Sequence, residues 1–94
     1  MKRIPTHPGA VLREDVFPAL NMAKTKIARA LGISRSMLYA ILAEDVPITP
    51  NIALRLGKFL GNGPELWMDM QVAHDLAVTA RAMKRELNGV RKVA

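Results

Sequence analysis

Cysteine is absent from this sequence of 94 residues. Its absence excludes disulfide bonds, thiolate metal ligands and a cysteine nucleophile. Histidine is nearly as scarce: His7 and His74 are the only two, and we expect His74 to be a packed or half-exposed side chain. Glu65, Asp69 and Asp75 are too few and too scattered to predict a metal site. No glycine-rich phosphate loop occurs, so we expect neither an enzyme nor a cofactor.

Long hydrophobic runs are also missing, although hydrophobic residues make up 50% of the chain. No stretch approaches the roughly 20 apolar residues of a membrane-spanning helix. The first residues, MKRIPTHPGAVLRED, begin with basic side chains, but prolines and charges interrupt them where a signal peptide has its apolar segment. We therefore expect no membrane partner and a cytoplasmic location. The length suits a single compact domain, whose small core favours dimerisation.

Acidic residues are fewer than basic ones, and they are absent from one long segment of the chain. The chain has 14 Lys and Arg against 8 Asp and Glu, which gives a net charge of +6. Such an excess favours a polyanionic partner but by itself indicates only non-specific attraction. The distribution is more informative, because no carboxylate occurs from Val16 through Ala43 while all 8 acidic residues lie elsewhere.

Helical periodicity and capping residues predict five helices and no strand, so the fold class should be all-α. The first helix is expected to open at His7-Pro8 and to end at Pro18. The others are expected at about 24–31, from Ser34 to about 42, from Thr49-Pro50 to about 60, and at about 64–87. Trp67, the only tryptophan, should lie in the core or in an interface.

The segment KTKIARALGISRSMLYAIL, residues 24–42, has the spacing of a helix-turn-helix. Ala28 is small where the two helices would cross, Gly32 suits the turn, and Ile33 can fill the core. In such a pair the second helix enters the major groove of DNA, which is about 12 Å wide, and phosphates would repel carboxylates there. The alternative is an ordinary helical hairpin with a solvated charged face, although such faces usually mix both signs.

Five residues near the N-terminal ends of the two helices in this segment are predicted to contact DNA. Lys24 and Thr25, in the first turn of the first helix, should touch phosphate, where free N–H groups and the helix dipole also favour an anion. Ser34 can cap the second helix and bond phosphate. Arg35 and Ser36 are the first side chains to reach base edges, and Arg35 suits a bidentate contact with guanine.

Two further residues complete the predicted DNA interface. Tyr39, one turn further along, can contact a thymine methyl group or bond a phosphate. Asn51, near the start of the fourth helix, is a further candidate for a phosphate contact. Lys26 and Arg29 are interpreted as flanking, solvated charges.

The last predicted helix carries two apolar stripes that one face cannot hold. One stripe comprises Leu66, Met70, Ala73, Ala77 and Ala80, and the other Val72, Leu76, Met83 and Leu87. One stripe should therefore pack on the other helices and the other on a second subunit. The predicted dimer interface contains Val72, Leu76 and Met83. The alternative is a central helix buried within a monomer.

Most of the chain resembles Xre-type, lambda-repressor-like helix-turn-helix proteins, and in particular the HigA-type (VapI-like) antitoxins. The resemblance runs from HPGAVLRED at residues 7–15, through residues 24–42 and the following VPITPNIALRLGKFLGNG, to PELWMDMQVAHDL at residues 64–76. It implies a five-helix dimer that binds a palindromic operator in double-stranded DNA. It also implies that the protein neutralises a small RelE-like ribonuclease toxin and represses the operon encoding both.

The sequence departs from the usual family pattern at two places. Ala23 stands where a capping serine or threonine is common, and AED at residues 43–45 replaces a turn of the NG type that is followed by a basic residue. The second change removes an expected phosphate contact and adds two negative charges near the groove. It supports an alternative function in which toxin binding dominates and DNA binding is secondary. A free-standing Xre-type regulator without a toxin is the other alternative.

Overall fold

The computed structural model describes residues 3–93, and all regular structure within this range is helical. The elements are α1 (Pro8–Val11), the π-helical turn η1 (Leu12–Val16), α2 (Phe17–Leu20), α3 (Lys24–Leu31), α4 (Arg35–Leu42), α5 (Pro50–Leu60), α6 (Pro64–Ala82) and α7 (Lys84–Asn88). Because α1, η1 and α2 follow one another without a gap, they form one rod. The predicted all-α, five-helix fold is confirmed, with α7 as a short addition.

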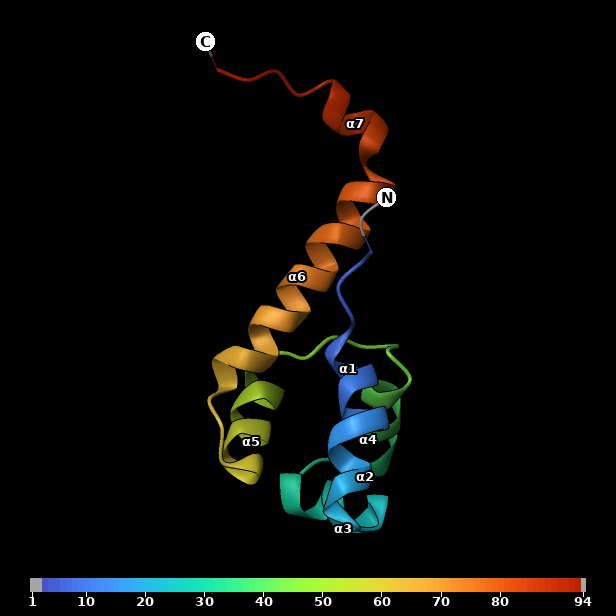
Figure 1. The fold of residues 1–94 in the computed structure, drawn as a ribbon, viewed down its shortest axis with the longest axis vertical. Coiled ribbons are helices and arrows are strands. Elements are labelled where there is room, and N and C mark those ends of the chain that lie inside the picture. The colour runs from blue at the N-terminus through green and yellow to red at the C-terminus, as the bar shows by residue number, and fades with distance from the viewer. Residues whose placement is uncertain (1–2, 94) are drawn as a thin grey trace.

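The helices form a small body from which α6 extends as an arm. Figure 1 shows the rod, α3 and α4 packed together with α5 beside them, while α6 leads away to α7 and the C-terminal end. The molecule is accordingly elongated, with extents of 53 × 22 × 22 Å. Its core lies between the rod, α3, α4, α5 and the start of α6, and the large hydrophobic side chains that are most completely buried in it are Trp67, Leu12, Ile27, Leu38, Ile41, Ile48 and Leu56.

Pro18 does not end the first helix, contrary to the prediction. The rod continues to Leu20 and ends at Asn21, whose φ of 54° is left-handed. Proline lacks the N–H that an α-helix needs, and its ring collides with the carbonyl group four residues earlier. The wider turn of η1, closed by the N–H of Phe17 on the carbonyl oxygen of Leu12, places Pro18 at the start of a new α-helical turn, where proline is tolerated.

The rod and α4 approach each other closely at Gly9. A Cβ atom on Gly9 would overlap the carbonyl oxygen of Ile41 and would lie 3.2 Å from its carbonyl carbon. Only a glycine permits this distance, because backbone of one helix rests directly on backbone of the other. Gly9 thereby sets the position of α4 relative to the rod.

The helix predicted at 64–87 is interrupted at Met83, where φ is −99° and ψ is 14°. Neither predicted stripe faces the core as a whole. The buried residues of α6 are instead Trp67 and Gln71, while Leu66 from the first stripe is 49% exposed. The reason is that only the first turns of α6 rest on the domain, and beyond them the helix has no surface of its own chain to cover. Trp67 is a core residue, as one of the two predictions for it stated.

Polar contacts fix the start of the arm on the domain. The buried Gln71 accepts the N–H of Ile48 at Oε1 (2.7 Å) and donates from Nε2 to Asp75 (2.9 Å). Further along, Nδ1 of the half-buried His74 lies 2.8 Å from the carbonyl oxygen of Pro5, and its ring meets that of His7 edge to face at 5.1 Å. These contacts hold the N-terminal segment around Pro5 and the loop between α4 and α5 against α6.

Candidate nucleic-acid interface

The turn between α3 and α4 is built by Gly32. Its φ of 74° is left-handed, a conformation that glycine adopts without strain. The N–H groups of Gly32 and Ile33 bond the carbonyl oxygens of Arg29 (3.1 Å) and Ala28 (3.0 Å), which closes the end of α3. The two helices therefore meet as a helix-turn-helix, as the spacing predicted.

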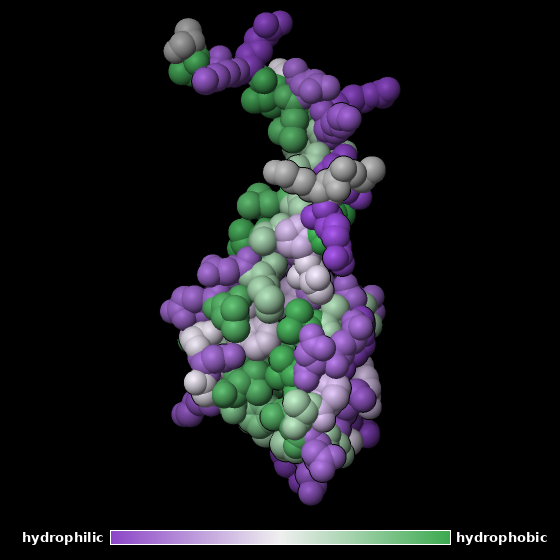
Figure 2. Space-filling model, viewed as in Figure 1, coloured by the Kyte–Doolittle hydropathy of each residue, from purple (hydrophilic) through white to green (hydrophobic). Residues whose placement is uncertain are grey.

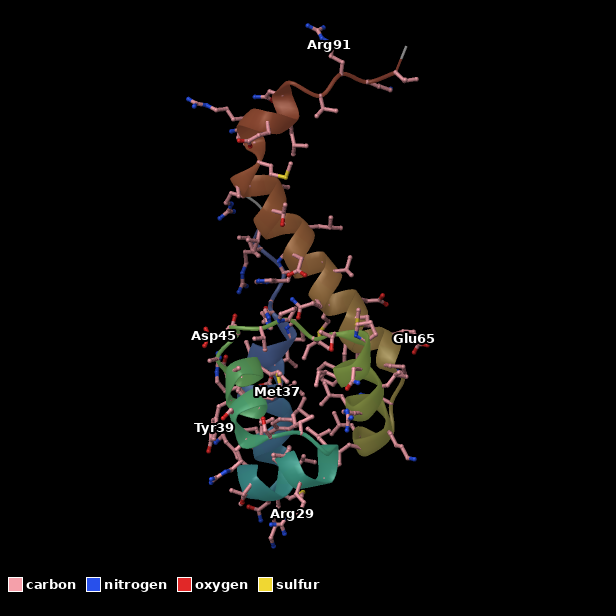
Figure 3. The ribbon with its side chains drawn as sticks, turned by 180° about the vertical axis from the view of Figure 1, so that it is seen from behind. Arg29, Met37, Tyr39, Asp45, Glu65 and Arg91 are labelled. Carbon is pink, nitrogen blue, oxygen red and sulfur yellow. The ribbon has the colours of Figure 1, made fainter. Side chains whose placement is uncertain are left out.

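Helix α4 presents the residues predicted to read DNA on its outer face. Ser34 is its N-cap, and its Oγ accepts the N–H of Met37 at 3.0 Å, which leaves the hydroxyl hydrogen available for a phosphate. Arg35, Ser36 and Tyr39 are all exposed, while the opposite face is buried in the core. Figure 3 shows Tyr39 directed away from the body of the domain, on the side opposite to Glu65.

The structure brings Thr25 and Arg35 together. Both line a shallow hollow of about 530 Å³ between α3 and α4, and Arg29 lines it with them. Arg29 is exposed, as expected of a flanking, solvated charge, and it is the second guanidinium at the same hollow. Lys24 lines a different hollow, between the rod, α3 and the end of α4, together with Arg13. The predicted residues of α3 thus line two hollows, neither of which has a carboxylate among its lining residues.

Asn51 lies on another element, at the start of α5, where Arg55 holds it. The Nε of Arg55 donates to Oδ1 of Asn51 at 2.7 Å. The Nη1 of the same guanidinium donates to the carbonyl oxygens of Leu31 (2.9 Å) and Gly32 (3.2 Å) in the helix-turn-helix. Only the amide NH₂ of Asn51 therefore remains as a donor to DNA. The i, i+4 spacing could have indicated the pair with Asn51, but not the contact with the turn.

Arg13, which the sequence analysis did not single out, closes the C-terminal end of α4. Its Nη1 donates to the carbonyl oxygen of Leu42 (2.7 Å) and to Glu44 (3.1 Å), and its Nη2 donates to Glu14 (2.7 Å). Hydrogen bonds to Glu14 and Glu44 raise the pKa of Arg13 above its ordinary value. Glu44 has a left-handed φ of 64°, which is the position where a glycine or asparagine is usual.

The contact with Arg13 reduces the effect that the acidic loop at residues 43–45 is expected to have on DNA binding. One of its two added charges, that of Glu44, is compensated by a guanidinium, whereas Asp45 is exposed at the end of α4 (Figure 3). The pair is accessible to solvent, so its main effect is on local charge rather than on stability. Glu44 accordingly gives less support than expected to a function in which DNA binding is secondary.

Residues 3–93 contain neither of two other kinds of feature, a metal site or a membrane-spanning helix. No group of three or more His, Asp or Glu side chains in this range could hold a metal ion. No helix in the same range is both long and apolar enough to cross a membrane.

Comparisons with known proteins give the family. No family model matches the chain. Virulence-associated protein I from Dichelobacter nodosus is 35% identical over 82 residues, which cover 87% of this chain and 75% of that protein. An addiction-module antidote protein of the HigA family from Coxiella burnetii shares 30% identity with a TM-score of 0.87, covering 98% of this chain and 100% of its own.

A third relative was solved with DNA. The antitoxin HigA of Pseudomonas aeruginosa, with the higBA promoter, has 27% identity and a TM-score of 0.86 over 94% of this chain and 96% of its own. Two of these relatives are named as an antidote and an antitoxin, which are not enzymes, and the resemblance predicted from the sequence is confirmed. The chain belongs to the HigA-type (VapI-like) antitoxin family of helix-turn-helix DNA-binding regulators.

Proposed function

We propose that this protein is a sequence-specific repressor that binds the operator of its own operon. The observation that carries the proposal is the acid-free surface of α3 and α4, where Thr25, Arg29 and Arg35 line one hollow. Phosphate contacts from Lys24, Thr25 and the N-terminus of α3 would orient the protein on the duplex. Helix α4 would then lie in the major groove.

The proposed roles on α4 follow from where its side chains emerge. Arg35 and Ser36, in the first turn, read base edges, and Tyr39 adds an apolar contact or a phosphate bond one turn later. Ser34 donates its hydroxyl hydrogen to phosphate, and Asn51 its amide NH₂. The structure of the related HigA with the higBA promoter supports binding of this protein to the promoter of its own operon. Operator binding would place the protein in the cytoplasm with the chromosome.

Binding is proposed to involve a homodimer on a palindromic operator. Val72, Leu76 and Met83 are 49%, 65% and 39% exposed, so the predicted interface residues are uncovered in the single chain. Figure 2 shows exposed hydrophobic residues on the arm next to hydrophilic ones. Pairing two such arms would bury these apolar side chains and space the half-sites about one helical turn, roughly 34 Å, or a multiple of it, apart.

The antitoxin function is proposed from the family. The resemblance implies a small RelE-like ribonuclease as the toxin, encoded beside this gene. The test is growth of cells that express the neighbouring small open reading frame, with and without this protein supplied in trans. Growth arrest that only this chain relieves would support the proposal. A harmless neighbour, or none, would favour a free-standing Xre-type regulator.

The DNA-binding proposal is tested by fluorescence anisotropy on operator and random duplexes. We expect Arg35→Ala to weaken operator binding by about 1–3 kcal/mol and to relax preference at one position of each half-site. Lys24→Ala should weaken both duplexes similarly and flatten the salt dependence. Arg91→Ala, which removes an equal charge from the far end of the arm, serves as the control. Equal losses on both duplexes for Arg35→Ala would refute its base-reading role.

A further inference from the structure

A shallow apolar groove lies between α5 and the start of α6. It has a volume of about 280 Å³, with Ala53, Leu54 and Met68 on its apolar walls and Glu65 and Asp69 beside them. Leu54 is 63% exposed, although it belongs to a well-packed helix. The groove shares no lining residue with the α3–α4 hollow, and none of the residues proposed to contact DNA lines it.

Charge is segregated along the arm that begins at this groove. Helix α6 carries Glu65, Asp69 and Asp75 before its only basic residue, Arg81, whereas α7 and the residues after it carry Lys84, Arg85, Arg91 and Lys92 against the single acidic residue Glu86. Figure 3 shows Glu65 at one end of the arm and Arg91 at the other. The helix dipole alone favours this order. In addition, the order makes two arms complementary when they run antiparallel and repulsive when they run parallel.

Two-fold symmetry then determines which residues meet. An antiparallel pair of α6 helices centred near Leu76 places residues equally far from this point opposite each other. Met83 and Asp69 are both seven residues from Leu76, or about 10 Å along a helix. Leu87 and Glu65 are both eleven residues away. The α7 segment of one subunit therefore reaches the α5–α6 groove of the other.

We propose that the α5–α6 groove of each subunit binds the α7 segment of a second copy of this chain. Leu87, which is 45% exposed, enters the groove, and Lys84 and Arg85 face the carboxylates of its rim. The proposal rests on the homodimer proposed above and adds a second, reciprocal contact to it. A chain cannot fill its own groove, because α6 holds α7 at the far end of the arm (Figure 1).

Charge reversal tests the electrostatic part of this contact. We expect Glu65→Lys/Asp69→Lys and Lys84→Glu/Arg85→Glu each to raise the dimer dissociation constant at least about tenfold, measured by analytical ultracentrifugation, because like charges then face each other. Combining all four changes in one chain should restore dimerisation, since the pairs are complementary again. Asp15→Lys, which reverses an exposed charge on the rod, is the control. Absence of weakening in the doubles, or of recovery in the fourfold variant, would overturn the proposal.

Cysteine crosslinking tests the position of α7 independently of charge. Because the chain lacks cysteine, a Leu54→Cys chain mixed with a Leu87→Cys chain can form a disulfide only between the introduced thiols. We expect the mixture to give a crosslinked dimer of the two different chains, faster than either chain forms one alone. A wild-type protein that is monomeric would refute the homodimer together with this inference. A dimer without this crosslink, or a crosslink only to another protein that copurifies, would overturn the inference and leave the DNA-binding proposal standing.

Discussion

Replacing Gly9 by alanine sets helix propensity against packing. In an exposed helix this change stabilises by up to about 1 kcal/mol. Here the new Cβ would overlap the carbonyl oxygen of Ile41, with the carbonyl carbon at 3.2 Å and Nδ1 of His7 at 3.0 Å. The obstacle is backbone and cannot rotate away, so α4 must move from the rod by a distance on the order of 1 Å to regain normal separations. Overpacking of this kind costs about 1–3 kcal/mol, and we expect a net loss of about 2 kcal/mol.

The measurement is urea denaturation followed by circular dichroism, at a fixed protein concentration because a dimer's stability depends on it. Gly89→Ala is the matched control: Gly89 has a φ of −85°, and a Cβ there would only touch the carbonyl oxygen of Glu86 at an ordinary 3.4 Å. Its effect should remain within about 0.5 kcal/mol. A Gly9→Ala variant as stable as the wild type, or more stable, would refute the reasoning, because propensity would then outweigh the contact with α4.

Three further predictions concern polar contacts. Gln71→Leu should lower the free energy of unfolding by about 1–3 kcal/mol, because the buried N–H of Ile48 loses its acceptor; an unchanged denaturation midpoint would contradict this. Arg55→Lys should weaken operator binding in anisotropy titrations, since an ammonium group cannot make the forked bonds to Asn51 and the turn. Burial and the neighbouring His74 lower the pKa of His7, so the unfolded chain binds a proton near pH 6.5 more readily than the folded protein does. Stability should therefore fall as the pH drops through 6.5, and His7→Asn, which keeps an N-cap, should reduce that slope in denaturation series; an unaltered slope would exclude His7 as its source.

The helices and their ends could be predicted from the sequence because they depend on local features. Ser34 and Thr49 cap α4 and α5 through their own side chains, and Gly32 and Gly61 adopt left-handed φ values of 74° and 77° where helices end. One exception is Met83, which interrupts the last predicted helix, and the other is Pro18. The π-helical turn before Pro18 allows the helix to continue past this residue. Such a turn is unfavourable by itself, and the packing of the rod on the core compensates for it.

The candidate DNA surface could be predicted only in part, because its support comes from distant residues. Thr25 and Arg35 were recognised from their positions at helix N-termini. Arg13 and Arg55 were not, since each contacts a carbonyl group more than twenty residues away along the chain. The sequence also could not show that only the first turns of α6 rest on the domain, because an apolar stripe looks the same whether its own chain or another subunit covers it.

The position of Trp67 has a practical consequence for optical experiments. It is the only tryptophan, it is 2% exposed, and its indole N–H donates to Asn62 at 3.2 Å where α5 turns into α6. Intrinsic fluorescence of the unlabelled protein therefore reports on the seating of α6 on the core. The α3–α4 surface holds no indole, so emission should shift when the domain unfolds and change little when DNA binds. A single spectrum can thus separate a variant that has lost its fold from one that has lost only its ligand.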